Sequence, residues 1–101
     1  MKKEEVIKVL REHMDEIRRF GVKRIGIFGS VARNEAGENS DIDFVVEFEK
    51  GKITIKNFGG LVLFLENLFN REVDVLTANG VGNIRIKSVR EQIKKEIEYV
   101  W

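Results

Sequence analysis

The sequence SDIDFVVEF at residues 40–48 decides the fold, because the hydrophobic pattern changes there to the two-residue period of a β-strand. Alternate residues from Ile42 to Phe48 are apolar and predict a buried face. The other face carries Asp41, Asp43 and Val45, followed by two glutamates. We therefore predict a strand that begins near Asp41 and has one apolar face and one largely acidic face.

The segments around this strand predict two more strands and four helices. The apolar runs Val22–Phe28 and Glu72–Leu76 predict the strands. The predicted helices are an N-terminal one with the stripe Val6, Leu10, Met14 and Ile17 that ends near Gly21, a short one capped by Ser30, one from Asn57 to Phe69 closed by Asn70, and a last one with Ile86, Val89, Ile93 and Ile97. Residues 53–55 are expected to add a short strand, and residues 77–83 a flexible loop.

The predicted elements follow the order α-β-α-β-α-β-α, and we expect an α+β fold with a small mixed β-sheet flanked by helices. No linker and no internal repeat interrupts the pattern. We expect a single domain that covers residues 1–101.

The composition excludes several classes of protein. The chain of 101 residues has 18 basic and 17 acidic side chains, a formal charge of +1, no cysteine and one histidine. A disulfide scaffold, a thiolate metal site and a multi-histidine metal site are therefore excluded. The balanced charge argues against stable nucleic-acid binding. The longest apolar run, residues 61–65, is too short to span a membrane, and we expect a cytoplasmic protein.

Aspartate is the informative residue type. The chain has only four aspartates, and Asp41, Asp43 and Asp74 fall in predicted strands, where aspartate is disfavoured. Asp41 and Asp43 point the same way, with Cβ atoms about 6–7 Å apart. This spacing suits a divalent metal that also holds polyphosphate, or else a solvated strand face.

Asp74 is predicted to lie in an interior strand, where an unpaired carboxylate is costly to bury. A neighbouring strand could bring it beside Asp41 and Asp43, where a metal or a shared proton would compensate. The alternatives are an edge strand or a buried ion pair with a residue such as Arg71.

The turn Gly29-Ser30 follows the first predicted strand and supplies features that suit a phosphate. A glycine lets a ligand approach the backbone closely, and the start of the next helix offers free N–H groups. The Ser30 hydroxyl adds a donor. By itself a Gly-Ser turn has little specificity.

These motifs together resemble a known family. FGS at residues 28–30, followed after ten residues by DIDF at 41–44, resembles the signature of the nucleotidyltransferase superfamily related to DNA polymerase beta. GSVARNE at 29–35, SDIDFVVEF at 40–48 and REVDVL at 71–76 are similar to the minimal nucleotidyltransferases (MNT proteins) over essentially the whole chain. Asn34 is a departure, because many relatives have glycine there, but it removes no ligand.

The resemblance implies a role for each matched residue. Gly29 and Ser30 would hold the nucleoside triphosphate. Asp41 and Asp43 would bind two Mg²⁺ ions, and Asp74 would complete the metal site and help to deprotonate the acceptor hydroxyl.

The sequence assigns less specific roles to two basic residues. Arg33 either contacts phosphate or forms a surface ion pair with Glu35 or Glu38. His13 is expected on a helix surface and not as a general base.

The resemblance also implies a function. Minimal nucleotidyltransferases are paired with HEPN-domain toxins, and their antitoxins transfer AMP from ATP to a tyrosine of the HEPN protein. About 100 residues leave little chain for a specific acceptor pocket, which favours a folded protein as acceptor. We therefore expect a Mg²⁺-dependent protein adenylyltransferase that acts as a type VII-like antitoxin. The alternatives are a non-catalytic binding antitoxin or nucleotide-sensing subunit, and transfer to a small molecule such as an aminoglycoside.

Overall fold

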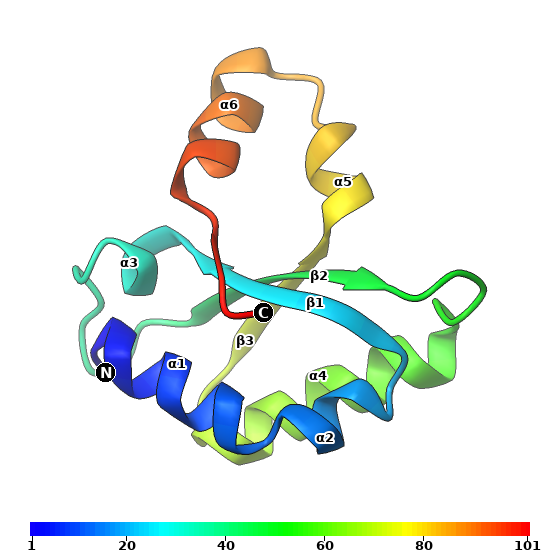
Figure 1. Ribbon diagram of the computed structural model, residues 1–101. Coiled ribbons are helices and arrows are strands. Elements are labelled where there is room, and N and C mark those ends of the chain that lie inside the picture. Colours follow the sequence, from blue (N-terminus) through cyan, green and yellow to red (C-terminus); the bar gives the residue numbers. More distant parts are fainter.

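The computed structural model describes residues 1–101 and contains the three predicted strands, a fourth short strand and six helices (Figure 1). In chain order the elements are α1 (Lys3–Glu12), α2 (Met14–Arg18), β1 (Val22–Phe28), α3 (Gly29–Ala32), β2 (Ile42–Phe48), α4 (Ile55–Phe69), β3 (Val73–Thr77), α5 (Ala78–Gly82), α6 (Lys87–Glu96) and β4 (Glu98–Tyr99). The prediction of an α+β fold is confirmed. None of the helices is both long and apolar enough to cross a membrane.

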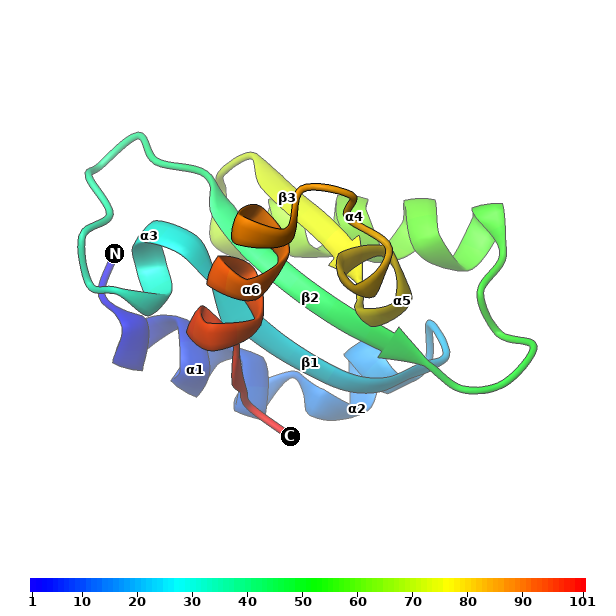
Figure 2. The ribbon, with the colours of Figure 1, turned by 90° about the horizontal axis from the view of Figure 1, so that it is seen from above.

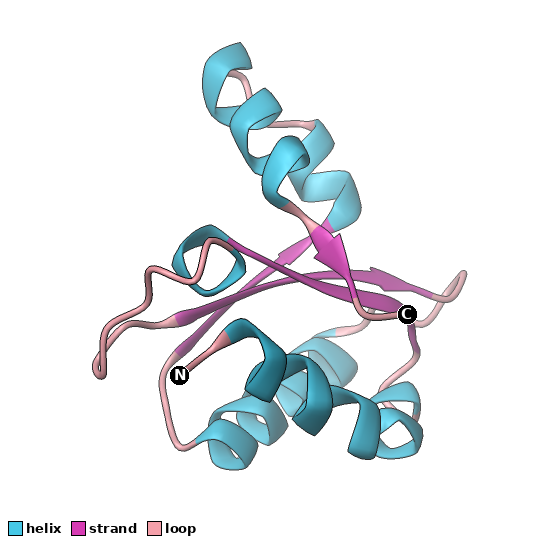
Figure 3. Cartoon of the chain, turned by 60° about the vertical axis from the view of Figure 1, so that its left-hand side comes forward, coloured by secondary structure: helices cyan, strands magenta, loops and turns pink.

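The four strands form one sheet in the order β3-β2-β1-β4. The sheet is mixed, as expected. β1 is antiparallel to β2 and β4, whereas β2 is parallel to β3. Helices α1, α2 and α4 lie on one face, and α5 and α6 project from the other (Figures 1 and 3). Seen from above, α3 stands at one end of β1 and β2 (Figure 2).

The main core fills the space between the sheet and α1, α2 and α4. It contains 14 buried residues, including alternate residues of β2 from Ile42 to Val46, so the predicted buried face is confirmed. The rings of Phe44 and Phe69 lie 5.7 Å apart between centroids, which ties β2 to α4. Each fully buried large side chain contributes on the order of 1.5–3 kcal/mol.

A second, smaller cluster lies on the opposite face of the sheet. Phe28, Val45 and Val81 are buried there, and Ile93 and Ile97 of α6 and its end pack against them. The face that carries Asp43 is therefore covered in part by α5 and α6.

The first predicted helix is wrong in one respect, because it is two helices. His13, with φ −112° and ψ 20°, separates α1 from α2. Val6, Leu10 and Ile17 are nevertheless all buried, so the apolar stripe continues across the break and the sequence pattern conceals it. His13 lies on the surface as expected, with its Nδ1 2.7 Å from Glu16 Oε1.

Two predicted helix starts and one predicted strand are also wrong. Thr54, not Asn57, caps α4, because its hydroxyl accepts a hydrogen bond from the Asn57 N–H at 3.0 Å. This cap starts the helix at Ile55 and leaves no strand at residues 53–55. Ser30 lies inside α3, whose N-cap is Phe28. The predicted closing residue of α4, Asn70, is confirmed in the left-handed conformation.

The segment after β3 is a helix and not the predicted loop. Thr77 caps α5 by accepting a hydrogen bond from the Gly80 N–H at 2.9 Å, and this bond offsets the low helix propensity of the two glycines. After α6 the chain forms β4, which the sequence pattern does not reveal. Val100 follows it, buried, and donates its N–H to the Ile25 carbonyl at 2.8 Å.

Two leucines of α4 test the core assignment. Leu65 is 0% exposed and Leu63 is 63% exposed. We expect Leu65→Ala to lower the free energy of unfolding by about 2–5 kcal/mol, because it leaves a cavity in the main core. Leu63→Ala should change it by no more than about 0.5 kcal/mol. Urea unfolding measures both, and similar losses for the two variants would show that the packing of α4 is wrong.

Candidate active site

Strand register brings the predicted site residues from three strands together. Phe28 at the end of β1 pairs with Asp43 on β2, and Asp43 lies opposite Asp74 on the parallel strand β3. Gly29 follows Phe28 directly. The acidic residue in the middle strand therefore has the Gly-Ser turn on one side and a second carboxylate on the other.

The Asp43 and Asp74 side chains lie close enough for their carboxyl groups to form a hydrogen bond when Asp43 is protonated. Asp43 is half-buried, and burial is the largest cause that raises its pKa to about 6. The hydrogen bond to Asp74 and the negative charges of Asp74 and Asp41 raise the pKa further, whereas Arg33 lowers it. Both other aspartates of the predicted site are thus close enough to act electrostatically on Asp43.

The expectation of an interior position for Asp74 is wrong, and the alternative of an edge strand is confirmed. β3 is an edge strand, and Asp74 is exposed, as Asp41 is. The other alternative, an ion pair with Arg71, is absent. Arg71 instead donates to the carbonyl oxygens of Gly37 and Ser40, each at 3.3 Å. It thereby ties the loop before β2 to the start of β3, which helps to set where Asp41 lies.

The aspartates supply the hard oxygen ligands that Mg²⁺ prefers. Asp43 and Asp74 form a close pair of carboxylates, and a cation bound by both would offset their repulsion, as protonation of Asp43 does below its pKa of about 6. The three carboxylates do not surround a single point as a ready-made three-ligand cluster. The carboxylate oxygens fit Mg²⁺, and the third carboxylate, that of Asp41, would have to move closer to Asp43 and Asp74.

Gly29 cannot be replaced without disturbing Asp43. Its φ is +71°, a conformation that residues with a side chain rarely adopt, and a Cβ added here would collide with the Asp43 carboxylate. Ser30 follows in the first turn of α3, partly exposed. The turn therefore brings bare backbone against the central aspartate.

Arg33 forms two ion pairs on the surface. Its Nε lies 2.9 Å from Glu35 Oε2, one of the two partners predicted from the sequence, and its Nη1 lies 2.7 Å from Glu96 Oε1. Hydrogen bonds to Glu35 and then to Glu96 raise the pKa of Arg33 further above its ordinary value.

Glu96 was not foreseen from the sequence. Besides Arg33, its carboxylate accepts hydrogen bonds from the Gly29 N–H at 3.3 Å and from Gln92 Nε2 at 2.7 Å. Burial alone would raise the pKa of Glu96, but the hydrogen bonds from Gln92 and Arg33 outweigh burial and lower it. No sequence motif signals this residue, because only the return of α6 over the sheet brings it to the turn.

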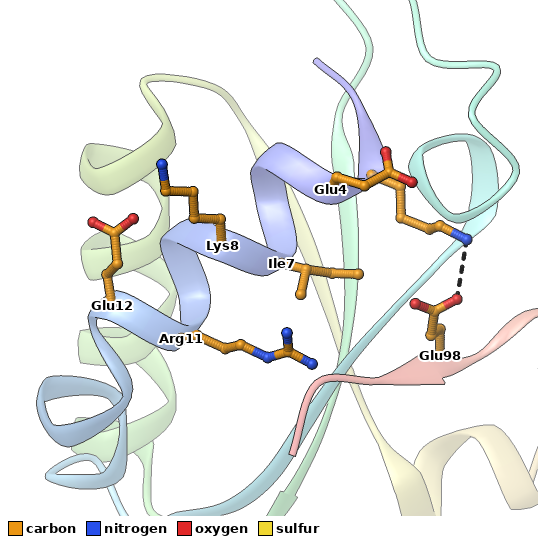
Figure 4. Close-up of a pocket in the computed structure, with 7 residues that line it drawn as sticks. Glu4, Ile7, Lys8, Arg11, Glu12 and Glu98 are labelled. Carbon is orange, nitrogen blue, oxygen red and sulfur yellow. Dashed lines mark hydrogen bonds and ion pairs between the residues drawn. The ribbon is translucent and has the colours of Figure 1, made fainter.

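The site is an open surface and not a deep cavity. A hollow of about 410 Å³ adjoins Asp41, between residues 38–41 and 69–72. The largest hollow, about 680 Å³, lies elsewhere, along the outer side of α1 (Figure 4). Its lining is mostly charged, and Lys3 Nζ lies 3.1 Å from Glu98 Oε1 at one end. A molecule that contacts the aspartates therefore reaches them from the open surface.

The raised pKa of Asp43 gives a test of the carboxylate cluster. Between pH 3.8 and about 6 the folded protein keeps a proton that the unfolded chain has released, so the free energy of unfolding falls as pH rises. Without metal, Asp43→Asn should therefore stabilise the fold by about 1 kcal/mol at about pH 7.5, a figure reduced for partial exposure, and by less near pH 4.

Urea unfolding in the presence of a chelator measures this difference. Asp15→Asn, which removes the same charge from an exposed position on α2, is the matched control and should show no such pH-dependent gain. If Asp43→Asn destabilised the metal-free protein at both pH values, Asp43 would be a structural residue.

Comparison with known proteins agrees with this geometry. Residues 7–100 match the family model described as a nucleotidyltransferase domain. The protein adenylyltransferase MntA of Thermococcus cleftensis is 37% identical over 98 residues, which cover 96% of this chain and 94% of that protein.

Solved structures show the same fold. A provisionally named minimal nucleotidyltransferase has a TM-score of 0.75 at 34% identity and covers 97% of this chain and 95% of its own. The complex of a tri-AMPylated Shewanella oneidensis HEPN toxin with its MNT antitoxin gives a TM-score of 0.56 at 18% identity, over 98% of this chain and 68% of that one, and shares the fold. The chain belongs to the nucleotidyltransferase domain family, and within it to the minimal nucleotidyltransferases, and is therefore a nucleotidyltransferase enzyme.

Proposed function

We propose that this enzyme transfers AMP from ATP to a hydroxyl group of a protein, in a reaction that depends on Mg²⁺. The observation that carries the proposal is the meeting of Asp43 and Asp74 beside Gly29, with Asp41 close enough to act on Asp43. The relative in Thermococcus cleftensis is named a protein adenylyltransferase, which supports the same reaction here.

Each residue of the site has a defined task in this reaction. The Gly29 N–H, the Ser30 hydroxyl and the Arg33 guanidinium contact the oxygens of the triphosphate beside Asp43. The acceptor hydroxyl attacks the α-phosphorus, the bond to the β-phosphate oxygen breaks, and pyrophosphate leaves. The proton of the hydroxyl passes to Asp74, which is exposed and lies beside Asp43.

Asp41, Asp43 and Asp74 would hold the two Mg²⁺ ions. When bound, these ions stabilise the negative charge that develops on the attacking and leaving oxygens.

The open site favours a folded protein as the acceptor. Asp41 and Asp74 are exposed, and the hollow beside Asp41 measures only about 410 Å³. We propose a HEPN-domain toxin as the partner and one of its tyrosines as the modified residue, with this protein as a type VII-like antitoxin in the cytoplasm. The AMPylated HEPN toxin named in the structure from Shewanella oneidensis supports this choice of partner.

Intact-mass analysis tests the proposal. After incubation with Mg²⁺, ATP and the co-encoded HEPN protein, we expect an AMP-sized increment on the HEPN protein. Asp43→Asn should lower the transfer rate by at least about a hundredfold, because it removes the central carboxylate. Asp15→Asn should transfer at the normal rate. Inhibition of the toxin with no mass change, retained in Asp43→Asn, would instead identify a non-catalytic binding antitoxin.

Two glycines with similar positive φ angles isolate the role of the Gly-Ser turn. Gly29 and Gly51 have φ values of +71° and +76°, but a Cβ at Gly51 would meet nothing within 4 Å. Gly29→Ala should abolish transfer, because the new methyl group displaces Asp43. Gly51→Ala carries a similar strain of about 1 kcal/mol and should retain transfer. Equal activity of the two variants in the same mass assay would show that Gly29 is not part of the site.

A further inference from the structure

The last turn of α6 places a carboxylate against the Gly-Ser turn. Glu96 accepts hydrogen bonds from the Gly29 N–H at 3.3 Å and from Arg33 Nη1 at 2.7 Å. These two donors lie 67 and 63 residues away in sequence. Figure 2 shows α6 crossing above β1 toward α3, which is how the chain makes this contact.

Unlike a solvated surface glutamate, Glu96 is largely buried and its carboxylate accepts several hydrogen bonds. Its side chain is 11% exposed, whereas Glu35, the other partner of Arg33, is 64% exposed. Burying an ionised carboxylate is unfavourable unless donors surround it. Gly29, Arg33 and Gln92 supply those donors, so the carboxylate remains ionised, in agreement with its lowered pKa.

Two of these donors are the groups that the proposed function assigns to the triphosphate. A backbone N–H donates one proton, and a guanidinium prefers a charged acceptor such as a carboxylate or a phosphate. The Gly29 N–H cannot serve Glu96 and a phosphate oxygen fully at the same time. The two anions would also repel each other at this distance.

We propose that Glu96 is an internal anion that occupies phosphate-binding donors of the nucleotide-free enzyme, and that the triphosphate displaces it. This inference rests on the proposed function and adds a regulatory contact at the same site. Binding of ATP then has to break the contacts of Glu96, so the apparent affinity for nucleotide is lower than the donors alone would give.

Displacement has a structural consequence for α6. Glu96 ends this helix, and the Ile97 N–H donates to the Ile93 carbonyl at 3.1 Å just beyond it. Ile93 and Ile97 pack on the small cluster of Phe28 and Val45. Release of Glu96 loosens the last turn of α6. The conformation of α6 therefore depends on whether nucleotide is bound.

The nucleotide affinity of a charge-neutral variant tests the proposal. Glu96→Gln keeps the size of the side chain and removes its charge. We expect it to bind ATP, in the presence of Mg²⁺, about fivefold or more tightly than the wild type by calorimetry, and to bind tripolyphosphate more tightly as well. Glu91→Gln, the same change on the exposed side of α6, should leave both affinities unchanged.

Unchanged or weaker binding by Glu96→Gln would overturn the proposal, and weaker binding would identify Glu96 as a residue that positions Arg33 for the phosphates. If the wild type binds ATP and transfers AMP in either case, the proposed function stands and only the role of Glu96 fails. If the wild type binds no ATP, both fail.

Amide hydrogen exchange provides a readout that does not depend on a variant that folds well. In the wild type, saturating ATP should increase exchange at the Ile97 amide and change the NMR resonance of the Gly29 amide. In Glu96→Gln, exchange at Ile97 should already be fast before ATP is added. Slower exchange at Ile97 in wild type on ATP binding would show that Glu96 stays in place, and would also overturn the proposal.

Discussion

The register of the three strands β1, β2 and β3 is the constraint on which the site depends. A shift of one residue in β2 would turn Asp43 toward the main core and expose Phe44 or Ile42. That shift is prevented because Ile42, Phe44 and Val46 are fully buried against α1, α2 and α4. Core packing on one face of the sheet therefore fixes the carboxylates on the other, and the stability of the fold and the geometry of the chemistry have one cause.

The sequence predicts β1, β2 and β3, because β2 has a two-residue apolar period and the other two are short apolar runs, but it does not predict the break between α1 and α2. The stripe through Val6, Leu10 and Ile17 runs on across the interruption at His13, so no pattern marks it. α5 depends on a single hydrogen bond to the Thr77 hydroxyl, which offsets the low helix propensity of its two glycines. β4 is too short to show any hydrophobic period. These elements are decided by tertiary contacts and single hydrogen bonds, which local sequence does not record.

The site divides in the same way. Asp43, Asp74 and Gly29 could be selected from residue type and spacing, and the parallel pairing of β2 with β3 places the two aspartates side by side. The sequence leaves both a buried and an exposed Asp74 open, since edge or interior position is a property of the whole sheet. Glu96 could not be selected at all, because it lies next to two lysines on a segment that reads as solvated, and only the path of α6 brings it to Gly29.

The short strand β4 also affects the tendency of the protein to aggregate. Unpaired backbone groups along a sheet border can recruit a strand from another chain and start aggregation. β4 and Val100 occupy those groups on β1 from Ile25 to Ile27. Of the two edge strands, β3 is the longer, with five residues against two in β4, and the exposed carboxylate of Asp74 is the kind of charge that discourages strand addition. Asp74 would thus limit aggregation in addition to its proposed role in the active site.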